Sequence, residues 1–174
     1  MGSEVTGSGA LPLASPWLRL AAAIIDSLIL WPINYLLGFT LLKQPSITDI
    51  MEASKKGQDA VDAIMPSTGL MLLTQVVGVA VFIGINFVLL KKGHTIGKKL
   101  VKIQVQHRNT GALLTVQDII LKRVLPVYAV GALGAVIHPA INFLLLIDVL
   151  MIFRKGRNTL HDDIANSKVV QLSQ

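Results

Sequence analysis

Two long apolar runs limit what this chain can fold into. Residues 20–42 carry one charge, Asp26, and residues 69–90 carry none. At about 1.5 Å per residue, each run is long enough to cross a bilayer core of roughly 30 Å as an α-helix. Charged residues make up only 15% of the 174 residues, against about 25% in soluble domains. The pattern therefore indicates an integral membrane protein and argues against a soluble enzyme or a disordered chain.

A third apolar stretch, residues 124–153, has two interpretations. It contains Asp148, and Pro126 and Pro139 interrupt it. It could form one tilted or kinked span, or a hairpin of two short helices broken near His138 and Pro139. Short helices of this kind need cover from protein around them. The hairpin would return the basic tail to the cytoplasm, which the distribution of positive charge favours.

The basic residues are concentrated in one segment. Half of the 16 Lys and Arg residues lie within residues 91–123. Positive charge accumulates on the cytoplasmic side of membrane proteins, so we expect this segment and the N-terminus to be cytoplasmic and residues 43–67 to lie outside. These side chains either hold anionic lipid headgroups or only set the orientation. The candidates are Lys91, Lys92, Lys98, Lys99, Lys102, Lys122 and Arg123.

The polar segments predict a few small elements. Residues 101–105 alternate as a strand does, residues 168–170 resemble a second short strand, and residues 48–65 could form an amphipathic helix. Thr115 is a plausible N-cap for the helix that follows it. The predicted fold class is an all-α integral membrane protein: a helical bundle of two clear spans plus the third apolar stretch, with a small cytoplasmic segment of strand and amphipathic helix. We expect a flexible tail over residues 1–16, a membrane domain over 17–170 and a short C-terminal tail over 171–174.

Asp26 is the acidic residue that most needs a partner. A carboxylate near the centre of a membrane costs about 3 kcal/mol or more, so we expect it to be neutral or paired inside the protein. Arg19 lies on nearly the same helix face but about 10 Å away along the axis. A bridging group from another segment is therefore expected. The candidates are Asp162, Asp148, Gln75 and Asn86.

This group of polar residues supports two interpretations. Asp26 could be a protonatable or cation-binding carboxylate, or part of a buried ion-pair network that fixes how the helices pack. Gln75 and Asn86 share one helix face, where amides commonly form hydrogen bonds between helices. His161, beside Asp162, could act as a switch or form a local hydrogen bond.

The sequence contains no motif for metal binding, phosphate binding or nucleophilic catalysis. The chain has no cysteine, and its four histidines lack the spacing of a metal site. Residues 93–99 have two glycines and two lysines but not the spacing of a phosphate-binding loop. No Ser, His and Asp residues occur in the context of a nucleophile motif. We therefore expect no enzyme activity, no metal and no cofactor.

Three stretches in order resemble the RDD family of small integral membrane proteins. They are residues 17–26 (WLRLAAAIID), residues 93–100 (GHTIGKKL) with the strand after them, and residues 157–162 (RNTLHD) with Val169 and Val170. The resemblance covers about residues 16–170. It implies that Arg19, Asp26 and Asp162 are the arginine and two aspartates of the family name, with Asp148 as a competitor for the last position. Residues 163–167 depart from the usual family ending.

The resemblance and the composition together lead to two functional hypotheses. The first is a non-enzymatic accessory or scaffold subunit of a membrane assembly, whose partners are the lipid bilayer and other membrane subunits or a second copy, and not nucleic acid. The second is a small-solute or cation/proton transporter with Asp26 as the titrating carboxylate, since transport has been suggested for the family. In either case we expect a multi-pass protein of the bacterial cytoplasmic (inner) membrane.

Overall fold

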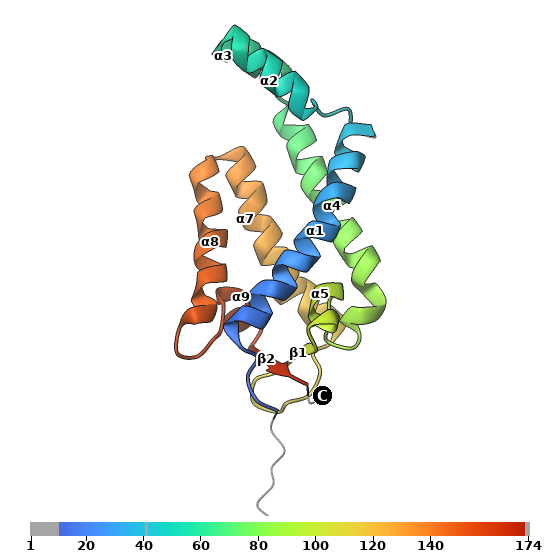
Figure 1. The fold of residues 1–174 in the computed structure, drawn as a ribbon, viewed down its shortest axis with the longest axis vertical. Coiled ribbons are helices and arrows are strands. Elements are labelled where there is room, and N and C mark those ends of the chain that lie inside the picture. Colours follow the sequence, from blue (N-terminus) through green and yellow to red (C-terminus); the bar gives the residue numbers. More distant parts are fainter. Residues whose placement is uncertain (1–10, 41, 173–174) are drawn as a thin grey trace, which may run out of the picture.

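A computed structural model of the chain describes residues 11–40 and 42–172. It contains three helices long and apolar enough to cross a membrane (Figure 1). They are α1 (Pro16–Thr40), α4 (Thr68–Leu90) and a continuous helix from Val116 to Val136. The last is built from α6 (Val116–Ile119), the π-helical turn η1 (Ile120–Val124) and α7 (Leu125–Val136). Thr115 caps it through a hydrogen bond from the Asp118 amide, which confirms the predicted N-cap.

The third apolar stretch forms a hairpin. After α7 the chain turns at His138 and continues through η2 (Pro139–Asn142), α8 (Phe143–Leu150) and η3 (Met151–Phe153). In Figure 1, α7 and α8 lie side by side as the two arms. The His138 ring accepts a hydrogen bond from the Ala140 amide, 3.1 Å away. Residues 124–153 therefore do not form one continuous helix, because an extended His138 before Pro139 breaks it.

The loop between α1 and α4 contains two helices, where the sequence predicted one over residues 48–65. They are α2 (Ile47–Lys56) and α3 (Gln58–Ile64). Gly57 separates them with φ of 109°, a backbone conformation that only glycine adopts readily. Figure 1 shows α2 and α3 projecting at the end of the molecule far from the strands.

A small assembly of helices and strands covers the other end, and we call it the cap. It comprises residues 11–15, α5 (Ile96–Leu100), β1 (Ile103–His107), α9 (Leu160–Ile164) and β2 (Ser167–Gln171). The two strands are antiparallel, with Ile103 opposite Gln171 and His107 opposite Ser167. The first strand begins later than predicted because Lys102 has a φ of 56° and so ends the preceding turn.

Part of the predicted N-terminal tail belongs to the cap. The Ala14 amide donates to the carbonyl of Val169, and the Gln171 amide donates to the carbonyl of Pro12, both at 2.9 Å. Residues 12–14 are thus held along β2, in contrast to a flexible tail over 1–16, of which residues 1–10 lie outside the described residues. Gln171, assigned above to the C-terminal tail, is the last residue of β2.

The hydrophobic core lies where the cap meets the helix ends. Few residues of the first two spans are buried: Ala22 and Gly38 in α1, and Gly78, Asn86 and Leu90 in α4. The faces of these helices are therefore left for lipid or other proteins. The buried core cluster consists of Ala14, Ala22, Leu90, Ile103, Val105, Leu114, Ile119, Val124, Ala165 and Val169.

Candidate functional site

The first and last helices meet at a buried ion pair. The guanidinium of Arg19, in the first turns of α1, binds Asp162 in α9 and also donates to the carbonyl of Arg157. Asp162 is fully buried. Its position is fixed by a capping box: the Thr159 amide donates to the Asp162 carboxylate at 3.0 Å, and the Asp162 amide donates to the Thr159 hydroxyl at 3.2 Å.

Arg123 is the third member of this cluster. Its guanidinium binds the other oxygen of Asp162 and the Ser167 hydroxyl. We call Arg19, Arg123 and Asp162 the arginine–aspartate cluster. Burial alone would raise the pKa of Asp162, but the positive charges of Arg123 and Arg19 outweigh it and hold that pKa far below its usual range.

The position of Arg123 differs from the prediction. The sequence placed it among the basic residues that face headgroups or set orientation, yet only 7% of it is exposed. Arg123 lies in the π-helical turn η1, where both it and Val124 are buried. A charge buried to this extent requires a partner, and Asp162 provides it.

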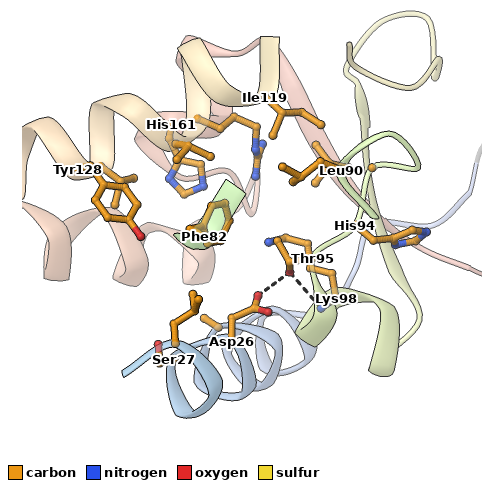
Figure 2. A pocket seen from close by; sticks show the side chains of 17 residues that line it. Asp26, Ser27, Phe82, Leu90, His94, Thr95, Lys98, Ile119, Tyr128 and His161 are labelled. Atoms are coloured by element: carbon orange, nitrogen blue, oxygen red, sulfur yellow. Dashed lines mark hydrogen bonds between the residues drawn. The ribbon is translucent and has the colours of Figure 1, made fainter. Parts of the chain in front are cut away.

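Asp26 does not join the arginine–aspartate cluster. Its carboxylate accepts one hydrogen bond from the Thr95 hydroxyl (Figure 2). It accepts a second, of 2.7 Å, from the Gly97 amide. These donors anchor α5 to α1. The two helices are so close that a Cβ on Gly97 would lie 2.2 Å from the carbonyl oxygen of Ala22. The predicted bridge between Arg19 and Asp26 is absent from the described residues, and Thr95 and Gly97 were not predicted as partners.

Asp148 pairs with a histidine. One carboxylate oxygen lies 2.7 Å from Nδ1 of His161, and the other accepts a hydrogen bond from the His161 amide at 3.2 Å. This contact joins α8 to α9. Asp162, and not Asp148, is thus the partner of Arg19. His161 bonds to Asp148 in place of its neighbour Asp162, and burial lowers the pKa of His161.

The two amides of α4 have different surroundings. Asn86 is buried, donates to the carbonyl of Phe82 at 3.0 Å and accepts a hydrogen bond of 2.9 Å from the Ile96 amide, which ties α4 to α5. Gln75 lies farther along α4, where it lines a separate cavity with Asn142. The structure thus brings Asn86 to the cap and leaves Gln75 away from Asp26.

Most of the predicted basic residues are at the surface. Lys91, Lys92, Lys99, Lys102 and Lys122 are exposed. The Lys91 ammonium lies 4.6 Å from the centre of the Phe87 ring, and Lys122 pairs with Asp118 at 2.6 Å. These positions agree with contact to headgroups or solvent, whereas Lys98 is half-buried.

Lys98 and Asp26 line a cavity of about 340 Å³ beneath the cap, which we call the Lys98 cavity (Figure 2). Phe82 and Tyr128 contribute aromatic rings, and the rest of the lining mixes aliphatic side chains with the polar Ser27, His94, Thr95, Arg123 and His161. Within residues 11–40 and 42–172, the Lys98 ammonium has no hydrogen bond or ion pair. Burial, together with the charge of Arg123, lowers the pKa of Lys98 to about 8.

Comparison with known proteins gives one match. The model described as the RDD family matches residues 13–166, which is most of the chain and includes Arg19, Asp26 and Asp162. No curated protein matches the chain, and no solved structure matches it.

Proposed function

The chain belongs to the RDD family, and from this premise we propose that it is a non-enzymatic accessory or scaffold subunit of a membrane assembly. One observation carries the proposal. The family arginine and both aspartates are engaged in contacts within the chain, and each contact joins a membrane helix to the cap. Residues used in this way build a rigid platform.

The anchoring contacts form a consistent set. The arginine–aspartate cluster joins α1 and η1 to α9, and Asp26 joins α1 to α5. Asp148 adds a link between α8 and α9. Removing one partner from a buried ion pair is strongly destabilising, so these contacts hold the cap in one position on the helices. A fixed cap on little-buried spans is what a subunit of a larger assembly requires.

The spans offer the surface for such an assembly. In α8, Leu146 is 52% exposed and Leu150 is 53% exposed, while Val76 of α4 is 65% exposed. In lipid, helices associate through close packing and interhelical hydrogen bonds. We propose that other membrane subunits or a second copy pack on these faces in the bacterial cytoplasmic membrane, with the basic cap on the cytoplasmic side.

Cross-linking in native membranes tests this proposal. The chain has no cysteine, so Leu146→Cys and Val76→Cys each introduce a single reactive site. We expect at least one of them, labelled with a membrane-permeable maleimide that carries a benzophenone, to give a discrete cross-linked product on illumination. Lys99→Cys, on the exposed side of the cap, is the matched control and should remain monomeric. Monomer alone at both membrane positions would contradict the proposal.

A second function, cation/proton exchange, is favoured by one observation: Asp26 lines the Lys98 cavity. Proteoliposomes that contain the purified chain test it through cation-dependent proton flux. A scaffold gives no flux above protein-free vesicles. Flux that disappears in Asp26→Asn and persists in the exposed control Asp49→Asn would establish exchange instead.

A further inference from the structure

The Lys98 cavity has an uneven distribution of charge. Its lining carries two cations, Lys98 and Arg123, and one anion, Asp26. Asp26 already accepts hydrogen bonds from Thr95 and Gly97, and Arg123 is bound to Asp162. Lys98 is thus the cation whose charge is not matched by a contact within the described residues. An anionic group next to it would satisfy this charge.

Part of the remaining lining is suited to hydrocarbon, beside the polar residues Ser27, His94, Thr95 and His161. Phe82, Tyr128, Val124 and Val127 contribute apolar surface to the lining, and Figure 2 shows both aromatic rings across the cavity from Asp26. A volume of about 340 Å³ falls within the range of small-molecule sites, roughly 300–1,000 Å³. The cavity therefore combines one cationic end with an apolar wall.

The cavity continues onto the outer face of α1. Ala23 and Ser27 line both the cavity and a second, shallow apolar depression along this helix. Leu28 and Trp31 line that depression and are 69% and 63% exposed. In a bilayer this face contacts acyl chains. A molecule whose head lies at Lys98 can therefore extend its tail along α1 without leaving apolar surroundings.

The depth of Lys98 agrees with this arrangement. The span α4 ends at Leu90 and is followed at once by the exposed Lys91 and Lys92, which marks the level of the headgroups. Lys98 belongs to α5, which packs against α1 close to this end of α4. Its ammonium is therefore near the depth at which phospholipid phosphates lie.

We propose that the Lys98 cavity binds one anionic phospholipid, with its phosphate at Lys98 and an acyl chain along Leu28 and Trp31 of α1. A lysine ammonium binds phosphate as a compact point charge. The phosphate would also offset the repulsion between Lys98 and Arg123. This proposal is independent of the assembly proposed above, because it concerns an internal cavity and not the outer faces of α4 and α8.

Native mass spectrometry of the full chain provides the test. The delipidated protein in detergent is titrated with phosphatidylglycerol, and the bound lipids are counted. We expect one lipid to bind more tightly than any others, and Lys98→Gln to weaken that binding about tenfold, as loss of a charge-assisted contact implies. Lys99→Gln removes the same charge from an exposed neighbour on α5 and should change the binding less than about twofold.

Two further variants separate binding from folding. Lys98→Arg keeps the charge and should retain the lipid. Ala23→Phe adds bulk where the cavity meets the depression on α1 and should weaken binding while Lys98 remains. A cooperative thermal unfolding transition in each variant establishes that the variant is folded. The proposal is overturned if phosphatidylcholine binds as tightly as phosphatidylglycerol, or if Lys98→Gln and Lys99→Gln lose binding equally.

The source of the phosphate is decided in a last arm of the experiment. Glycerol 3-phosphate carries the phosphate without acyl chains and is added at millimolar concentration to the lipid-bound protein. A lipid site predicts that the lipid stays bound. Displacement of the lipid in the unmodified chain but not in Lys98→Gln would instead identify a site for a free organic phosphate and would overturn the lipid proposal.

Discussion

Arg19 binds Asp162 across 143 residues of the chain. The pair joins the first turns of α1 to α9 and is almost completely removed from solvent. Arg123 binds the same carboxylate from η1. The relative positions of α1, η1 and α9 therefore depend on the Asp162 carboxylate.

Replacement of Arg19 should destabilise the fold strongly. Arg19→Ala leaves Asp162 with one guanidinium and removes the hydrogen bond to the Arg157 carbonyl. Breaking a buried pair costs about 3–5 kcal/mol. Because Arg123 partly offsets this loss, we expect the free energy of unfolding to fall by about 3 kcal/mol. Chemical unfolding in detergent, followed by circular dichroism, measures it.

An exposed ion pair provides the control for Arg19→Ala. Arg154 binds Asp163 at the surface, where both side chains are more than a third exposed. Exposed pairs contribute about 0–1 kcal/mol, so Arg154→Ala should unfold nearly as the unmodified chain does. Equal losses in the two variants would refute the role assigned to the buried cluster.

The arginine–aspartate cluster should make stability depend on pH in the acidic range. The pKa of Asp162 is lowered in the folded state by Arg123 and Arg19. Its stabilising contribution is therefore complete above the unfolded value of about 3.9 and is lost as the pH falls through the lowered folded value. Asp162→Asn lacks this contribution. The difference in unfolding free energy between the unmodified chain and Asp162→Asn should be largest near neutral pH. It should become steadily smaller below about pH 4.

The helices could be predicted from the sequence more fully than the contacts between them. The two apolar runs coincide closely with α1 and α4, and Thr115 caps a helix as expected. These features depend on local composition and on residues a few positions apart. The hairpin at His138 was one of two interpretations, because apolar length alone does not distinguish a kink from a turn.

The partners of the charged residues were harder to predict because they are distant in sequence. Thr95 is 69 residues from Asp26, and Gly97 is 71 residues from it. A sequence by itself contains no distances of this kind. Arg123 did carry a signal, because it follows the buried Ile119 by one helical turn and precedes the buried Val124. A basic residue between such apolar neighbours needs a partner if the helix face is buried.

The close contact between α5 and α1 predicts that Gly97 cannot be replaced. In Gly97→Ala the new methyl group would lie 2.2 Å from the carbonyl oxygen of Ala22, so α5 must move and Asp26 must lose its hydrogen bond from the Gly97 amide. We expect a loss of about 3 kcal/mol or more. Gly84→Ala, in α4, has no atom within 4 Å of the added Cβ and should leave stability unchanged or slightly improved. Thermal unfolding of both variants in the same detergent measures the difference.

Lys98 should reduce the stability of the delipidated protein near neutral pH. Burial lowers its folded pKa to about 8, below the value of about 10.4 in an unfolded chain. The unfolded state therefore binds more protons between these two values, and stability rises with pH across that window. Lys98→Met should be more stable by about 1–2 kcal/mol near pH 7, and this advantage should shrink toward about pH 10. Lys99→Met, at an exposed position, should show neither effect in the same pH series of thermal unfolding.

The orientation of the chain can be read by labelling single cysteines in intact cells. Because the native sequence has none, Lys55→Cys in α2, Lys99→Cys in the cap and Lys155→Cys after η3 each report one position. The hairpin of α7 and α8 returns the chain to the cap, and α2 projects at the opposite end (Figure 1). Positive charge favours the cytoplasm for the cap, so an impermeant maleimide should label Lys55→Cys from outside and should reach the other two only after the membrane is opened. Labelling of Lys155→Cys from outside, with Lys99→Cys protected, would mean that residues 124–153 cross the membrane once.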